Sequence, residues 1–141
     1  MRETWTFHSA GQLLFGRNAV RQLGEIAARL TVRRILLVTD PVLVKVGTAE
    51  RVRKPLTEAG AAVETFDGGE PEPSVRAADA CIATARRFKP DAVLGLGGGS
   101  NMDLAKITAT LLAHGGRPRD YVGEDRIPGP VLPLEIGRAH V

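Results

Sequence analysis

The most informative segment of this 141-residue chain is Gly95-Leu-Gly-Gly-Gly-Ser-Asn-Met-Asp-Leu-Ala-Lys106. It follows the apolar run 92–96 and opens a segment of helical periodicity that ends near His114. Because glycines carry no Cβ, a phosphate can approach such a loop closely and meet successive backbone N–H groups. The positive end of the following helix dipole favours the same anion. One glycine would suffice for a sharp turn, so three in succession indicate a phosphate-binding loop.

Periodicity alternates between strand-like and helix-like segments along the rest of the chain. Continuous apolar runs are typical of strands buried on both faces of a parallel sheet. The alternation predicts a doubly wound, Rossmann-like α/β domain with a mostly parallel sheet. The expected elements are strand 5–8, helix 19–30 capped by Asn18, strand 35–39, helix 48–59 ended by Gly60, strand 62–66, a helix to 87 capped by Ser74, strand 92–96 and helix 101–114.

Asp40, at the end of the expected strand 35–39, is the candidate acid for a bound nucleotide. The usual dinucleotide fingerprint places an acidic residue about 20 positions after the glycines, where it binds ribose hydroxyls. Here the acid precedes the glycines, but the end of a parallel strand also borders the ligand crevice of an open α/β sheet. Asp40-Pro41 fits an Asx turn or helix cap equally well. Both interpretations stay open on sequence alone.

Composition argues against nucleic-acid and membrane partners. Basic residues exceed acidic ones by 19 to 16, but they are scattered, and aromatic residues make up 4% of the chain. A nucleic-acid surface would cluster the cations beside stacking aromatics. There is no apolar run of the roughly 20 residues needed to span a bilayer, and the N-terminus lacks a signal-peptide pattern. We expect a cytoplasmic protein in which the lone cysteine, Cys81, is a small buried hydrophobe.

The glycine segment also resembles a family motif. Gly97 to Lys106 is similar to the GGGS-x-x-D-x-A-K motif of iron-containing (group III) alcohol dehydrogenases. Val38-Thr-Asp-Pro41, Asp120-Tyr-Val-Gly123 and the proline-rich stretch 127–134 resemble further segments of that family in the same order. The resemblance implies an NAD(P)-binding domain over residues 1–134, from an oxidoreductase that interconverts small alcohols and aldehydes or ketones by hydride transfer. It also implies a homo-oligomer.

The resemblance assigns cofactor-binding roles by position. Asp40 would hold the adenosine ribose, and an acid there repels a 2′-phosphate, which favours NAD over NADP. The family often has Asn before Pro near position 72, where this chain has Glu72-Pro73. The residues expected to cradle the pyrophosphate are Gly97, Gly98, Gly99, Ser100, Asn101 and Asp103.

The resemblance also implies a metal that this chain does not hold. In the family an Asp and three His in a later helical domain bind Fe²⁺ or another divalent ion. His8, His114 and His140 are widely separated and show no helical pairing, so we expect neither metal ligands nor catalytic residues here. Residues 135–141 resemble the translation of a common sequencing-library adapter. We therefore expect a fragment with a non-native tail and no activity of its own.

Two other interpretations remain. A maleylacetate reductase or a glycerol dehydrogenase-like enzyme would use a similar glycine turn. A non-catalytic nucleotide-binding module would need only the domain described above.

Overall fold

The computed structural model describes residues 11–123 and 125–138 as one α/β domain. Expected and observed bounds agree to within two residues for six elements, among them 62–66 and 92–96. Two 3-10 turns, Ala19–Gln22 and Pro118–Tyr121, accompany the main elements. In chain order these are α1 (Leu23–Arg29), β1 (Arg34–Val38), α2 (Pro41–Lys45), α3 (Thr48–Glu58), β2 (Ala62–Phe66), α4 (Val75–Phe88), β3 (Ala92–Gly97), α5 (Gly99–His114) and β4 (Leu134–Arg138).

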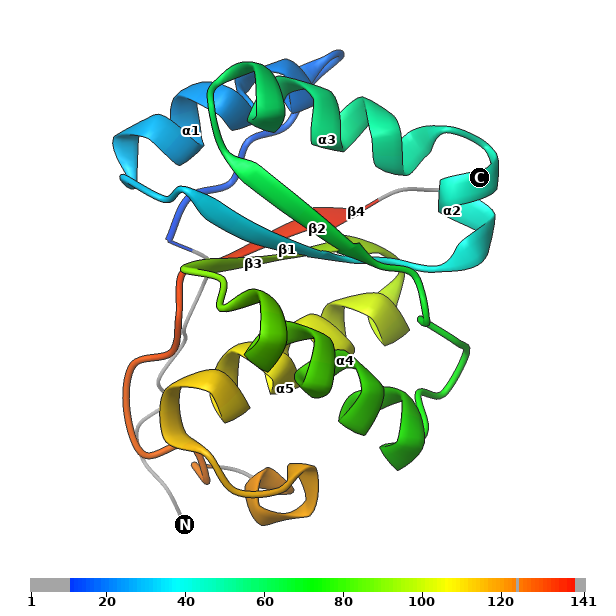
Figure 1. Ribbon diagram of the computed structural model, residues 1–141, viewed down its shortest axis with the longest axis vertical. Coiled ribbons are helices and arrows are strands. Elements are labelled where there is room, and N and C mark those ends of the chain that lie inside the picture. Colours follow the sequence, from blue (N-terminus) through cyan, green and yellow to red (C-terminus); the bar gives the residue numbers. More distant parts are fainter. Residues whose placement is uncertain (1–10, 124, 139–141) are drawn as a thin grey trace, which may run out of the picture.

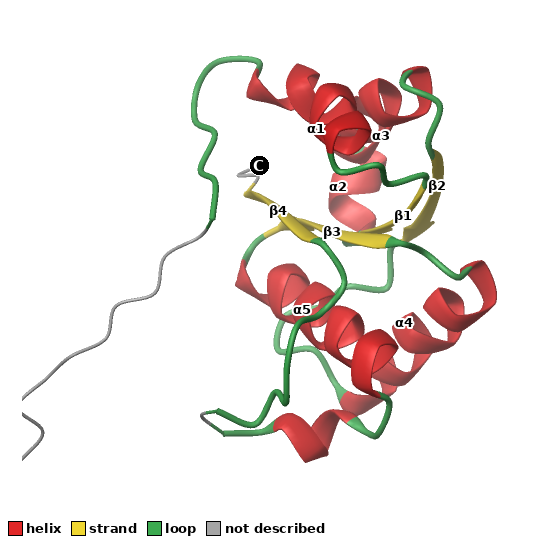
Figure 2. Ribbon diagram, turned by 90° about the vertical axis from the view of Figure 1, so that its left-hand side faces the viewer, coloured by secondary structure: helices red, strands yellow, loops and turns green. Residues whose placement is uncertain are grey.

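A four-stranded parallel sheet of order β2-β1-β3-β4 forms the centre of the domain. Helices α1 and α3 cover the upper face of the sheet in Figure 1, and α4 and α5 cover the lower face. Figure 2 shows the same three layers with the sheet nearly edge-on. The predicted doubly wound α/β fold is therefore confirmed.

Both faces of the central strand β1 are buried, as its apolar run predicts. Successive side chains of a strand point to opposite faces, so the run feeds two cores at once. Ile35 and Leu37 pack with Val52 and other residues of α3, whereas Leu36 packs toward α4 and α5. The two cores fix the helices on either face and leave the strand ends to carry polar residues.

The expected helix 19–30 differs from the structure at its start. Asn18 adopts a left-handed conformation with φ 62°, and its side chain caps no helix. Asparagine tolerates this backbone region better than most residues, so it serves here as a turn residue. A 3-10 turn follows, and α1 begins only at Leu23. The predicted N-cap at Asn18 is therefore wrong. The expected strand 5–8 lies outside the described residues.

The structure also differs from expectation near the end of the chain. Residues 134–138 form β4, whereas the sequence interpretation set 135–141 apart from the fold. In β4, Leu134 is the partner of Val93 and Arg138 is the partner of Gly97. Pairing of this kind uses main-chain groups and is compatible with many side chains. Within the described residues, no helix is long and apolar enough to cross a membrane.

Candidate functional site

A crevice opens where the carboxyl ends of β1 and β3 lie side by side. From β1 the chain passes through α3 to β2 on one side, and from β3 it passes through α5 to β4 on the other. The strand order therefore reverses between β1 and β3, and open α/β sheets bind their ligands at such points. The crevice has a volume of about 440 Å³ and is lined by residues 40–43, 69–71 and 98–101.

The three consecutive glycines have different reasons to be glycine. Gly97 has φ +133°, and a Cβ there would overlap the side-chain nitrogen of Asn101. Gly98 and Gly99 adopt no left-handed backbone. Apart from their chain neighbours and the nearby backbone of α5 itself, no described atom lies within 4 Å of where their Cβ atoms would stand. The fold itself therefore requires glycine only at position 97. The space over the other two belongs to the crevice.

Helix α5 begins at Gly99, two residues earlier than expected, so that Gly99 and Ser100 form its first turn. Gly98 is the N-cap in an extended conformation, and none of the described side chains caps this helix end. The first N–H groups of a helix have no partner within the helix. In a helix of 16 residues they also carry the positive end of a substantial dipole. This end of the crevice can bind an anion through the main chain.

Asp40 caps a helix and also lines the crevice. Its Oδ1 accepts a hydrogen bond from the Leu43 amide at 3.0 Å, so the side chain caps α2, and the cap interpretation is confirmed. Its Oδ2 accepts a hydrogen bond from Asn101 Nδ2 at 2.8 Å. The half-buried carboxylate also lines the crevice. Each carboxylate oxygen can accept more than one hydrogen bond, so Asp40 can still receive a ligand hydroxyl.

The structure brings most of the predicted site residues together but separates one of them. Asp40, Gly98, Gly99, Ser100 and Asn101 all line the crevice. Gly97 lies directly behind them as the last residue of β3. Asp103 is exposed, does not line the crevice, and forms an ion pair with Lys106 at 3.3 Å.

Sequence analysis missed the loop 69–71 as the third wall of the crevice. Glu70 Oε1 accepts hydrogen bonds from the hydroxyl and the amide of Ser74, at 2.6 and 3.2 Å. These bonds, the hydroxyl first, lower the pKa of the Glu70 carboxyl. Ser74 in turn caps α4 by accepting from the Ala77 amide, as predicted. The sequence offered one signal for this contact, because Glu70 stands four positions before Ser74, the predicted helix cap.

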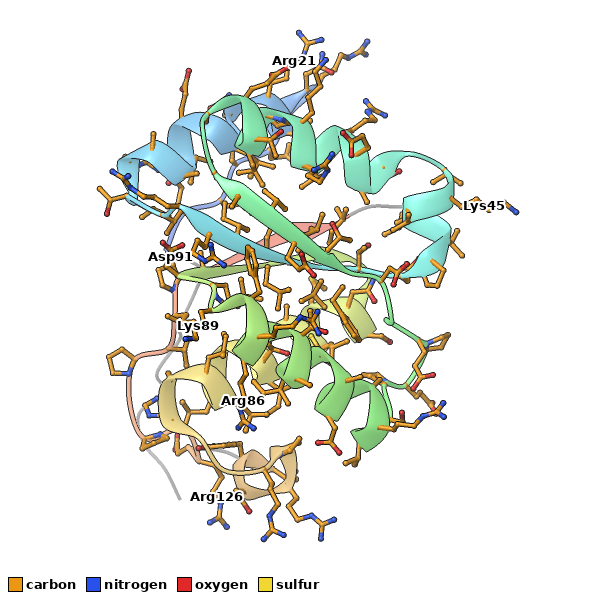
Figure 3. All side chains as sticks on the ribbon, viewed as in Figure 1. Arg21, Lys45, Arg86, Lys89, Asp91 and Arg126 are labelled. Carbon is orange, nitrogen blue, oxygen red and sulfur yellow. The ribbon has the colours of Figure 1, made fainter. Side chains whose placement is uncertain are left out.

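The charges around the crevice are one-sided. Asp40 and Glu70 supply two carboxylates, and among the described lining residues there is no lysine or arginine. A third carboxylate, that of Asp91, has a structural role instead and lies at the opposite end of the sheet from Lys45 in Figure 3. It accepts hydrogen bonds from the amides of Arg33 and Arg34 and fixes the start of β1. The groups of the described lining that can attract an anion are therefore main-chain amides and the Ser100 hydroxyl.

The described residues do not fit a metal ion. Over residues 11–123 and 125–138, no three or more His, Cys, Asp or Glu side chains come together in a metal-binding group. His114 ends α5, as predicted, with its Nε2 atom 3.3 Å from the carbonyl oxygen of Gly129. His8 and His140 lie outside the described residues.

Comparison with known proteins identifies the family. Residues 10–136 match the family model of iron-containing alcohol dehydrogenases. The chain belongs to this family. The match covers the glycine loop, Asp40 and the loop 69–71, so the crevice lies within the part shared with other iron-containing alcohol dehydrogenases.

Three relatives illustrate the similarity. Long-chain-alcohol dehydrogenase 1 of Geobacillus thermodenitrificans is 41% identical over 107 residues, which cover 76% of this chain and 27% of the relative. NAD-dependent methanol dehydrogenase of Bacillus methanolicus is 33% identical, with 86% and 32% covered. The crystal structure of sulfoacetaldehyde reductase from Bifidobacterium kashiwanohense in complex with NAD⁺ is 27% identical, with a TM-score of 0.84 and 94% and 35% covered. The chain thus spans about a third of these iron-containing alcohol dehydrogenase family proteins.

Proposed function

We propose that this chain is the NAD-binding domain of an alcohol dehydrogenase that interconverts alcohols and aldehydes or ketones. The observation that carries the proposal is the open space over Gly98 and Gly99, beside the uncapped start of α5. No internal contact requires glycine at these two positions. A ligand group that comes close to the main chain supplies the missing reason.

The dinucleotide fits the crevice as follows. Its pyrophosphate lies against the amides of Gly98, Gly99 and Ser100, where the helix dipole favours negative charge. Its adenosine ribose lies toward Asp40, whose carboxylate accepts from the ribose hydroxyls. The relatives support a nicotinamide cofactor, since one is NAD-dependent and another was solved with NAD⁺.

The charges in the crevice favour NAD over NADP. A 2′-phosphate would bring extra negative charge next to Asp40 and near Glu70. Like charges at short range repel each other, and no lysine or arginine of the described lining residues offsets the repulsion. An NADP-binding version of this site would need a basic residue there.

The chemistry of the proposed reaction belongs to the cofactor. A bound NAD would supply the acceptor for a hydride from the alcohol carbon, and the hydroxyl proton would pass to solvent or a base. The described residues of this chain bind and orient the nucleotide. They do not provide a set of ligands for the iron that gives the family its name.

Calorimetric titration with NAD tests the proposal. Gly98→Val places a bulky side chain over the start of α5, and Asp40→Ala removes the ribose acceptor. We expect each to weaken binding at least about tenfold, or about 1.4 kcal/mol. Gly11→Val is the matched control, because Gly11 also has open space around it but does not line the crevice. Equal affinities in the wild type, Gly98→Val and Asp40→Ala would refute the proposal.

A further inference from the structure

The side chain of Asn101 joins the segments that form the crevice. It is 3% exposed and lies in the first turns of α5, just beneath the crevice. Its Nδ2 atom donates to Asp40 Oδ2 at 2.8 Å and to the carbonyl oxygen of Leu96, also at 2.8 Å. One buried amide group therefore connects the end of β1 with the end of β3.

The chemistry of the two partners fixes the orientation of this amide. A carboxylate and a carbonyl oxygen both accept hydrogen bonds, so only the NH₂ group of Asn101 can face them. Its oxygen then points toward Gly69, where a Cβ would overlap Oδ1. A Cβ at Gly97 would overlap Nδ2 on the other side. Two glycines, one in the loop 69–71 and one at the end of β3, thus leave the space that this side chain fills.

We propose that Asn101 is a positioning residue, which orients Asp40 for the ribose and does not itself bind the nucleotide. The inference rests on the proposed function, and it assigns Asn101 a different role from the one expected on sequence, where it joins the pyrophosphate cradle. Both hydrogen atoms of its NH₂ group are already used within the protein. The amide therefore has no donor left for a phosphate oxygen.

The positioning acts through the second oxygen of Asp40. The Leu43 amide holds Oδ1, and Asn101 holds Oδ2, so the carboxylate is fixed at both oxygens. A carboxylate fixed in this way presents its remaining lone pairs in one direction. Without Asn101 it keeps only the bond to Leu43 and can rotate about that contact. Nucleotide binding must then order it again, which lowers the affinity.

A double-mutant cycle separates this role from a merely structural one. The NAD affinities of the wild type, Asn101→Ala, Asp40→Ala and the double variant are measured by calorimetry. If Asn101 acts through Asp40, Asn101→Ala weakens binding about tenfold in the wild type and less than about twofold in the Asp40→Ala background. An equal loss in both backgrounds overturns the inference, and so does no loss in the wild type.

Thr108→Val is the matched control on the same helix. Thr108 is buried away from the crevice, where its hydroxyl donates to Leu104 O at 2.7 Å and lies 3.2 Å from Cys81 Sγ. The Thr108→Val substitution should lower the thermal stability and leave the NAD affinity unchanged. If Asn101→Ala fails to fold, Asn101→Leu, which keeps most of the volume but has no donor, takes its place in the cycle with the same criteria.

The outcomes also separate this inference from the proposed function. A wild type that binds no NAD refutes the proposed function. A wild type that binds NAD, with Asp40→Ala weaker and Asn101→Ala additive to it, refutes only the role of Asn101.

Discussion

Substitution of Gly97 by alanine should destabilise the fold strongly, although it adds a single methyl group. The backbone at this position has φ +133°, a region that residues with a Cβ rarely adopt. Holding alanine in this region costs about 1–3 kcal/mol of stability. The new Cβ would also overlap the amide nitrogen of Asn101. That amide must then move and lose its hydrogen bonds to Asp40 and Leu96, one of which is to a charged group. Their loss costs about another 1.5–3 kcal/mol of stability.

Together these effects amount to about 2.5–6 kcal/mol, a large part of the roughly 5–15 kcal/mol that stabilises a typical domain. For a chain of this length we expect the melting temperature to fall by about 10–20 °C. The assay is thermal unfolding followed by circular dichroism. Urea titration gives the free energy of unfolding independently.

Gly98→Ala is the matched control in the same motif. Its backbone is extended, with φ −88° and ψ −171°, and its surroundings are open. The melting temperature should stay within about 2 °C of the wild type, since surface substitutions without special contacts are nearly neutral. Similar stabilities for Gly97→Ala and Gly98→Ala would refute the division of the glycines into structural and ligand-facing positions.

Two further predictions concern ionisable groups. Ser74→Ala removes the cap of α4 and should lower stability by about 1 kcal/mol at pH 7. The hydrogen bonds from Ser74 also lower the pKa of Glu70. The stability that these bonds contribute is therefore present above the unfolded-state pKa of Glu70 and is lost as the pH falls through its folded-state pKa. The difference in stability between Ser74→Ala and the wild type should therefore be smaller in thermal melts at pH 3 than at pH 7. An equal or larger difference at pH 3 contradicts a stabilising bond between Ser74 and the ionised Glu70. Burial raises the pKa of the Cys81 thiol to about 11, against a lesser lowering by Thr108. The native thiol should resist a thiol reagent at pH 8 and react after unfolding, and stability should decline as the pH rises toward 11; rapid reaction in the native state contradicts this.

The central part of the fold was predictable because its strands carry their own signal. The residues 35–38 and the run before the glycine loop are apolar, and the structure buries both on two faces. Ser74 was predictable as a cap because serine directly precedes a periodic segment. These features depend on residues close together in the sequence, so they can be predicted from one sequence alone.

Features that depend on distant residues were harder to predict. Helix α2 has five residues, too few for periodicity to show. The loop 69–71 reaches the crevice only because its chain crosses the end of β1, where the Gly69 amide donates to the Thr39 carbonyl at 2.9 Å. The bridge from Asn101 to Asp40 joins positions 61 residues apart. Sequence placed both residues at the site but could not show that one holds the other.

The absence of lysine and arginine from the described crevice lining has a kinetic consequence. Amide dipoles act over a few ångströms, whereas full charges act out to the Debye length of about 10 Å in dilute salt. A dinucleotide approaching this opening gains no guidance from a basic funnel and is recognised only once it docks. Its rate of capture should therefore hold or rise as the ionic strength increases, because salt screens the repulsion from Asp40 and Glu70. In enzymes that draw anions in from afar, the rate falls instead.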